Sequence, residues 1–167
     1  GTSLNLDHDD VDYLVNWPLH TWYNLNIRVD WLNKCSLTMP TTTEEFAEAL
    51  VQFQEQDANG NGAPNDEIPF TAAGEHISGA WGTSPMVFAG IISNQYFYVD
   101  GNTYQLVYDH PNYGQYLEMM QLLYSENLMD KEVVTHTYQD TRALQAANTA
   151  GSALQFTDAT TAAMKTL

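Results

Sequence analysis

The chain has 167 residues, of which 44% are hydrophobic, and this predicts one domain with a single core. Its formal net charge is −16, with five lysine and arginine residues against 21 aspartate and glutamate residues, which excludes nucleic acid and anionic membranes as expected partners. No apolar run is long enough to span a bilayer, and the single cysteine, Cys35, cannot form an internal disulfide. We expect Cys35 to be an inert, half-buried thiol.

The chain begins with a polar segment and continues into an aromatic one. Residues 1–10 lack an apolar period and predict a flexible tail, whereas residues 11–167 are expected to form a single α/β domain. Hydrophobic residues then alternate in a predicted strand that contains Tyr23, Leu25 and Ile27. A short helix is expected over Asp30 to Lys34, and Pro40 marks its exit into a loop.

A helix start signal follows. Thr42-x-x-Glu45 is a capping box, in which each side chain satisfies a backbone donor at the other position. Helical spacing of the next hydrophobic residues predicts an amphipathic helix from about Thr43 to Gln56, with an inner face made of Phe46, Ala49, Leu50 and Phe53.

An oxygen-rich stretch directly follows this helix. Asp57, Asn59 and Asn61 alternate with residues that include Gly60, and Gly60 and Gly62 permit the positive φ angles of a tight loop. Such spacing can wrap a hard cation such as Ca²⁺, which takes about six to eight oxygen ligands. We predict a structural calcium ion whose ligands come from Asp57, Asn59, Asn61, the carbonyl of Ala63, Asp66 and Glu67.

The same composition leaves a second interpretation open. Asn, Gly and Asp are also the commonest residues of plain surface turns. The stretch departs from the EF-hand pattern, because its twelfth position is Ile68 where an EF-hand has a bidentate glutamate.

Strands and helices alternate through the rest of the chain. Ile68 to Thr71 is a predicted short strand, and Gly79 to Ile92 a predicted buried helix. A β-hairpin is predicted from Tyr96–Val99 and Tyr104–Tyr108, with either a turn at Asp100-Gly101 or a longer loop through Asn102-Thr103.

Two further helices and a strand are predicted towards the C-terminus. The first helix starts near Pro111 and ends near Glu126, with an inner face of Tyr113, Tyr116, Leu117, Met120, Leu123 and Tyr124. A small-residue helix follows over Tyr138 to Thr149, with Leu144 and Ala147 inward, and then a strand over Ser152 to Phe156. A final helix runs to Leu167 without a cap, from which we expect the chain to be a fragment of a longer one.

No motif for catalysis stands out. The five histidines are scattered, none pairs with another at metal-ligand spacing on one helix, and the sequence has no phosphate-binding loop, nucleophile elbow or zinc signature. Carboxylates are plentiful, but none is marked as a glycosidase pair. We therefore predict a binding protein and not an enzyme.

Several motifs, in order, resemble a known family. The run from Leu25 to Pro69 reads Arg-x-Asp-Trp-Leu, Pro-x-Thr, Glu-Phe, Asp-x-Asn-Gly-Asn-Gly and Asp-Glu-Ile-Pro in succession. It is similar to the bacterial extracellular solute-binding proteins that serve ATP-driven sugar importers, including Gram-positive lipoproteins and alginate-binding proteins. The run Tyr116–Glu132 and the triplet Gly151-Ser152-Ala153 resemble later motifs of this family. Departures are Cys35-Ser36 and Asn127 where the family has glycine, and one extra residue before Asp66.

This resemblance implies one lobe of a two-lobe α/β fold that closes on a carbohydrate, expected to be an oligosaccharide, at the hinge. It implies a monomeric, extracellular lipoprotein or periplasmic protein whose partners are the membrane permease subunits of an ABC importer, and a calcium ion of structural role. Sugars stack on aromatic rings. We expect the ligand-binding residues to be Trp81, Trp17, Trp22 and Tyr23. Trp31 is expected to be packing and Arg28 to pair with a carboxylate.

Two alternatives belong to other classes of protein. The first is a calcium-dependent protein-interaction module of a cell-surface complex, although dockerin-like modules carry two such loops and this chain has one. The second is a glycoside-active enzyme, which would turn its substrate over.

Overall fold

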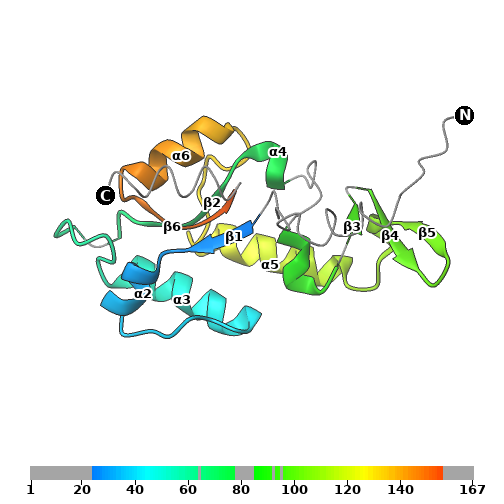
Figure 1. Cartoon of the computed structure of the whole chain (residues 1–167), viewed down its shortest axis with the longest axis horizontal. Helices are drawn as coiled ribbons and strands as arrows, with labels where there is room; N and C mark the ends of the chain where they lie inside the picture. The colour runs from blue at the N-terminus through cyan, green and yellow to red at the C-terminus, as the bar shows by residue number, and fades with distance from the viewer. Residues whose placement is uncertain (1–23, 64, 78–84, 92, 95, 156–167) are drawn as a thin grey trace, which may run out of the picture.

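The computed structural model describes residues 24–63, 65–77, 85–91, 93–94 and 96–155 (Figure 1). In chain order the elements are β1 (Asn24–Ile27), α2 (Val29–Lys34), α3 (Thr43–Glu55), β2 (Ile68–Ala72), α4 (Gly74–Ile77), the 3₁₀ helix η1 (Pro85–Ala89), β3 (Ser93–Asn94), β4 (Phe97–Asp100), β5 (Thr103–Leu106), the 3₁₀ helix η2 (Val107–Asp109), α5 (Tyr113–Ser125), α6 (Tyr138–Ala146) and β6 (Ala150–Gln155). Among these helices, none is both long and apolar enough to cross a membrane.

The main sheet has three strands in the order β1-β6-β2. Strand β6 pairs parallel with β2, with Ile68 opposite Ala150, and antiparallel with β1, with Asn24 opposite Gln155. The carboxyl ends of β2 and β6 and the amino end of β1 therefore share one edge, which we call the carboxyl edge. The amino ends of β2 and β6 form the opposite amino edge.

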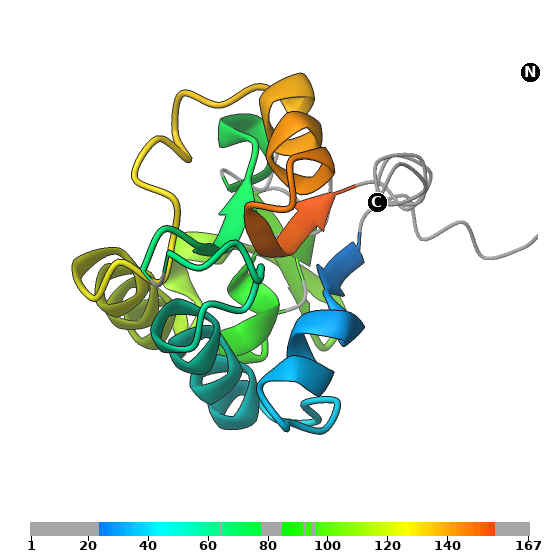
Figure 2. The same ribbon diagram turned by 90° about the vertical axis from the view of Figure 1, so that its left-hand side faces the viewer.

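Helices cover both faces of this sheet. The α/β class predicted from the sequence is therefore confirmed. Helix α6 lies on one face, and α2, α3 and α5 lie on the other (Figures 1 and 2). The core on the second face is built around fully buried aromatic rings, with Trp31 and Phe53 packed edge to face at a centroid distance of 5.3 Å. Gly151 of β6 is needed there, because a Cβ would come within 2.6 Å of both rings.

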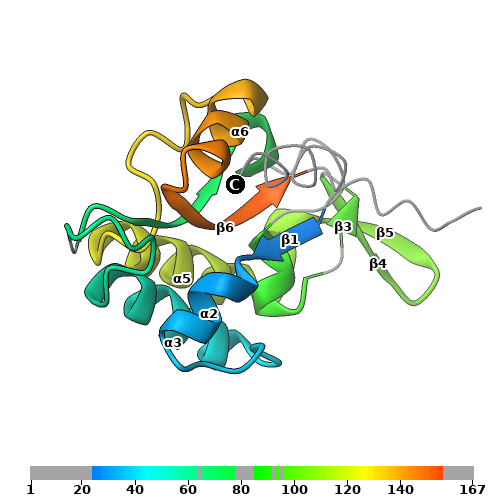
Figure 3. The ribbon, with the colours of Figure 1, turned by 60° about the vertical axis from the view of Figure 1, so that its left-hand side comes forward.

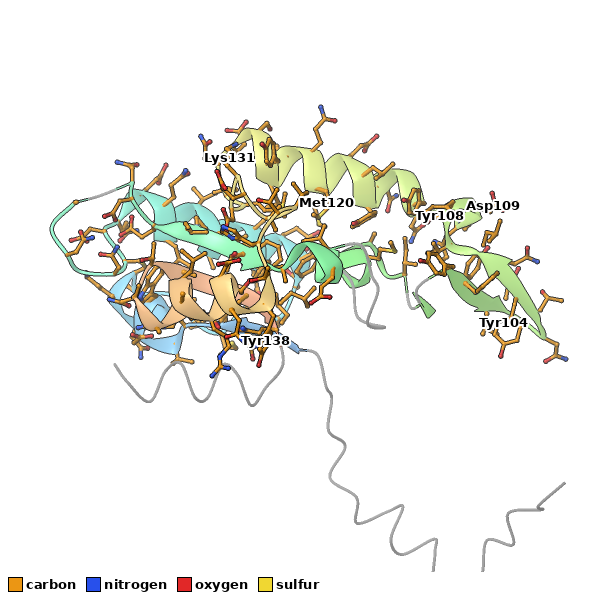
Figure 4. The ribbon with its side chains drawn as sticks, turned by 90° about the horizontal axis from the view of Figure 1, so that it is seen from above. Tyr104, Tyr108, Asp109, Met120, Lys131 and Tyr138 are labelled. Atoms are coloured by element: carbon orange, nitrogen blue, oxygen red, sulfur yellow. The ribbon has the colours of Figure 1, made fainter. Side chains whose placement is uncertain are left out.

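A second sheet, β3-β4-β5, projects from the far end of α5 (Figure 1). Its base is a small core of Met86, Ile91, Val107 and Tyr116. The strands themselves are largely exposed. Tyr104 of β5 is 78% exposed, and Tyr108 of the adjoining η2 is 55% exposed (Figure 4).

Most predicted elements are confirmed. The strand at Leu25 and Ile27, the short helix before Pro40, the strand after Glu67 and the strand at Ser152 all form. Helix α3 begins with the predicted capping box of Thr42 and Glu45, and its buried residues are the predicted four. The predicted tail and final helix lie outside the described residues.

Four details of the predicted elements are wrong. Pro85–Ala89, within the predicted buried helix, is a 3₁₀ helix, and the hairpin turns at Gly101-Asn102, because Asp100 pairs with Thr103. Tyr108 belongs to η2 and not to a strand. Helix α6 ends at Ala146, before the predicted Thr149.

The inner faces of α5 and α6 also differ from the prediction. Helix α5 buries Tyr116 and Leu123, which are two turns apart, so Leu117 and Tyr124, one residue further round, are exposed. On α6 the buried residues are polar, Thr141 and Gln145, in place of the predicted Leu144 and Ala147. Hydrophobic periodicity alone therefore predicts the wrong buried face of α6.

Candidate functional site

The oxygen-rich stretch forms a loop between the end of α3 and the start of β2, at the amino edge (Figure 3). Four of its residues have positive φ angles: Asp57 at 46°, Gly60 at 78°, Gly62 at 87° and Asn65 at 71°. Two of the four are glycines and one is asparagine, which tolerate this region well. The backbone therefore coils tightly enough for side chains at alternate positions to meet.

Backbone N–H groups orient the alternating oxygen atoms. The Asp57 carboxylate accepts hydrogen bonds from the N–H of Gly60 at 3.1 Å and of Gly62 at 3.2 Å. Asn59 Oδ1 accepts from the N–H of Asn61 at 2.9 Å, and Asn61 Oδ1 accepts from the N–H of Ala63 at 2.7 Å. These contacts hold the oxygen atoms of the three side chains against the backbone of the loop.

Asp66 and Glu67, at the other end of the loop, contact the same group of residues. The two Asp66 oxygens accept hydrogen bonds from Asn59 Nδ2 at 2.9 Å and from Asn61 Nδ2 at 2.7 Å. Glu67 Oε1 accepts from the N–H of Asn59 at 3.4 Å. The structure thus brings the five predicted side chains together. The Ala63 backbone is also part of the network.

Glu67 is the unusual member of this group. Its side chain is buried, at 6% exposure, and Oε2 has no hydrogen-bond partner. A buried carboxylate oxygen without a partner costs free energy, so buried charges are normally paired or bind a metal. Glu67 Oε2 is therefore a buried acceptor that no donor of the loop satisfies.

The chemistry of the donor set fits a hard cation. Within the described residues, no group of three or more His, Cys, Asp and Glu side chains is placed to hold a metal ion, so the three carboxylates do not suffice. Asn59 and Asn61 supply the remaining side-chain oxygens, and an all-oxygen set of carboxylates, amides and carbonyls suits Ca²⁺. The residues present therefore fit the group that the sequence predicts.

Asn148 ties the loop to the rest of the molecule. Its Nδ2 donates to the carbonyl of Asn59 at 2.9 Å, and its Oδ1 accepts from Nε1 of Trp31 at 3.2 Å. Asn148 precedes β6 and has a φ of 60°. Sequence analysis did not single it out. Its position between a helix and a strand was the available signal, because Asn favours this left-handed conformation.

Trp31 and Arg28 behave as the sequence predicted, whereas Cys35 is buried and not half-buried as expected. Trp31 is 1% exposed and serves packing, and the Arg28 guanidinium is paired with the Asp30 carboxylate. This hydrogen bond lowers the pKa of Asp30. Burial raises the pKa of the Cys35 thiol, while the positive charge of Lys34 opposes that rise and the negative charge of Glu67 adds to it.

The four predicted ligand-binding residues, Trp81, Trp17, Trp22 and Tyr23, lie outside the described residues. The carboxyl edge is where β1 begins and where β2 and β6 end. Tyr23 directly precedes β1, whose amino end is at this edge, and residue 81 falls in the segment that follows β2 and α4. Ligands of open α/β sheets bind outside the carboxyl ends of the strands.

Gln155 is a further residue of the carboxyl edge, at the end of β6. It is fully buried, and neither the oxygen nor the nitrogen of its side-chain amide has a hydrogen-bond partner.

The described surface also has an apolar groove of about 340 Å³ between α3 and α5 that includes Phe46, Val51 and Leu122. Its apolar lining does not suit a sugar, whose hydroxyl groups need hydrogen-bond partners.

The homologues and structural neighbours of this chain are substrate-binding proteins of ABC transporters for sugars, as the sequence resemblance predicts. FusA of Streptococcus pneumoniae serotype 4, a fructooligosaccharide ABC transporter substrate-binding protein, is 36% identical over 117 residues, which are 67% of this chain and 21% of FusA. Lipoprotein LipO of Bacillus subtilis is 50% identical over 36 residues, 22% of this chain and 7% of LipO. No family model matches the chain.

Solved structures agree with these relatives. FusA in complex with kestose superposes with a TM-score of 0.70 and 28% identity, over 81% of this chain and 28% of FusA. A further FusA structure, of an EF-hand mutant in complex with fructo-nystose, gives a TM-score of 0.67 and 25% identity over 82% of this chain and 28% of FusA. An HMO-binding solute-binding protein of Bifidobacterium longum infantis gives 0.74 and 25%, over 87% of this chain and 32% of that protein. The chain therefore spans about a third or less of these proteins.

Proposed function

We propose that this chain is part of the substrate-binding component of a sugar ABC importer, which captures an oligosaccharide outside the membrane. The observation that carries the proposal is the relationship to FusA, which extends over two thirds of the chain in sequence and over 81% of it in structure. The proposal includes transfer of the sugar to the permease subunits of the importer. The relatives are transport proteins, which favours binding without turnover.

The proposed sugar site is at the carboxyl edge of the main sheet. Trp81, Trp17, Trp22 and Tyr23 are the proposed stacking platforms, because aromatic rings cover the apolar C–H faces of a sugar. The segments that contain residues 22–23 and 81 join the described fold at the amino end of β1 and after β2. A cleft at this edge also agrees with the place where open α/β sheets bind ligands.

The proposed calcium ion has a structural role. Asp57, Asn59, Asn61, Asp66 and Glu67 would supply its side-chain ligands, and the carbonyl of Ala63 a backbone ligand. The loop is at the amino edge, and β2 separates it from the carboxyl edge by roughly 13 Å, at about 3.3 Å per residue. An ion there would neutralise the loop carboxylates and stabilise the folded state by binding to it alone. One of the FusA structures is described as an EF-hand mutant, which supports this assignment.

The proposed location is the cell surface or the periplasm. The relatives include a lipoprotein, LipO, and substrate-binding proteins of importers, which meet their solute outside the membrane. The acidic composition agrees with a solvated surface that does not bind anionic lipid.

The test is calorimetric titration of the whole protein with kestose and with an HMO mixture, together with chromatography of the sugar after prolonged incubation. We expect saturable binding and an unchanged sugar. Trp81→Ala should weaken binding by about two- to twelvefold, since a stacking ring contributes about 0.5–1.5 kcal/mol. Tyr124→Ala, which removes an exposed aromatic ring of α5, is the matched control. Sugar hydrolysis, or no binding to any sugar tested, would overturn the proposal.

A further inference from the structure

Lys34 places a positive charge directly beside the oxygen-rich loop. It is the last residue of α2, and its Nζ donates a hydrogen bond to the carbonyl oxygen of Asp57. The same Nζ is 3.9 Å from Oδ2 of the Asp57 carboxylate. It also lies 2.7 Å from the position of a Cβ built on Gly60. A glycine at position 60 therefore leaves the space that the ammonium group occupies.

The loop and Lys34 together have a simple balance of charge. Asp57, Asp66 and Glu67 contribute three negative charges, and Lys34 contributes one positive charge. The remainder is two negative charges, which a divalent cation neutralises. Without Lys34 the remainder would be three, which a trivalent cation would neutralise. The partly exposed Lys34 side chain is the cation that the described contacts place against this loop.

We propose that Lys34 is a built-in counter-charge that lowers the affinity of the loop for metal ions and sets its preference for divalent over trivalent ions. This inference rests on the proposed calcium site. Lys34 acts by repulsion, because an ion on the Asp57 carboxylate shares that group with the ammonium. The energy of such repulsion is proportional to the charge of the ion. Its strength also falls as salt screens the partly exposed ammonium.

Charge proportionality gives a prediction that a structural role of Lys34 does not share. Lys34→Met keeps the aliphatic stem of the side chain and removes the charge. If it raises the affinity for Ca²⁺ by about tenfold, it should raise the affinity for Tb³⁺ by about 30-fold, because the free energies scale as two to three. If Lys34 merely holds the loop in shape, its removal should lower both affinities by similar factors.

The experiment is calorimetric titration of demetallated protein with CaCl₂ and with TbCl₃, at about 50 and 500 mM KCl. The variants are Lys34→Met and Lys34→Gln, so that one poorly folded variant does not decide the result, and Lys34→Arg keeps the charge. Arg142→Met is the matched control, since Arg142 is a residue of α6 whose guanidinium lies 5.5 Å from the ring centroid of Tyr138.

We expect both neutral variants to bind Ca²⁺ more tightly and Tb³⁺ more tightly still, with the gain reduced at high salt. Lys34→Arg and Arg142→Met should resemble the wild type. Wild-type binding with equal or weaker binding by the neutral variants would overturn the role of Lys34 and leave the calcium site in place. If the wild type binds neither ion, and its titration does not differ from that of Asp57→Ala, the calcium site is overturned and this inference with it.

Discussion

Glu67→Gln should have opposite effects on stability with and without a bound ion. The substitution keeps the shape of the side chain and removes its charge. Glu67 is 6% exposed, and its Oε2 lacks a partner, so without a bound ion its charge would be buried at a cost. In the calcium-bound protein that charge would be a ligand, and its loss would weaken binding.

The expected magnitudes follow from burial and from linkage. Leaving a buried group unsatisfied costs about 1–3 kcal/mol for a neutral amide and more for a carboxylate. The amide of the variant also lacks a partner, so the variant should be more stable than the wild type in chelator only by the difference, on the order of 1 kcal/mol. Calcium at 100 times its dissociation constant stabilises the wild type by about 2.7 kcal/mol. If the variant binds at least tenfold more weakly, about 1.4 kcal/mol or more of this gain is lost.

The assay is urea unfolding of both proteins in chelator and in saturating CaCl₂. Glu55→Gln is the matched control, because Glu55 is an exposed glutamate at the end of α3, next to the loop. It reports the small benefit of removing any one charge from a protein with a net charge of −16. A Glu67→Gln variant that is less stable than the wild type in chelator would refute the argument that the buried charge of Glu67 costs stability.

Three further outcomes are expected. Asn148→Ala should cost about 2–3 kcal/mol in urea unfolding, more than Asn148→Gly, because it leaves Asn59 and Trp31 without their hydrogen bonds and also disfavours the positive φ. Hydrogen bonds from Thr41 lower the pKa of Glu45, so its stabilisation is present above the unfolded pKa and lost as pH falls through the folded one. The stability difference between wild type and Glu45→Gln should therefore shrink in melts taken from pH 6 to pH 3. Gly151→Ala should lower the free energy of unfolding by about 1–3 kcal/mol, because its Cβ meets two core rings.

Local signals predicted the elements whose structure depends on neighbouring residues in sequence. The capping box of Thr42 and Glu45 defines α3 whatever packs on it, and the spacing of Asp57, Asn59 and Asn61 defines a loop with converging oxygens. These features are read from side chains at most a few positions apart. The structure confirms the predicted capping box, whereas the predicted calcium loop stays a prediction.

Tertiary contacts decided what the sequence did not predict. Thr141 and Gln145 are buried on α6 because this face lies over β2 and β6, and hydrophobic periodicity pointed to Leu144 instead. Asn148 joins Asn59 to Trp31 across 89 and 117 residues of sequence. No local pattern contains such a contact, so the support of the candidate ion site required the structure.

The arrangement explains how an ion could affect a sugar site that it does not touch. Strands β2 and β6 begin at the amino edge, where the loop ends at Glu67 and where Asn148 holds the turn before β6, and both end at the carboxyl edge. Their pairing is parallel and almost wholly buried. A slip of one residue would turn every side chain to the other face, so the register is fixed wherever both faces are covered. If the loop binds the proposed cation, the ion would hold the start of β2, and the fixed register would carry that constraint along the strand to Ala72 at the carboxyl edge.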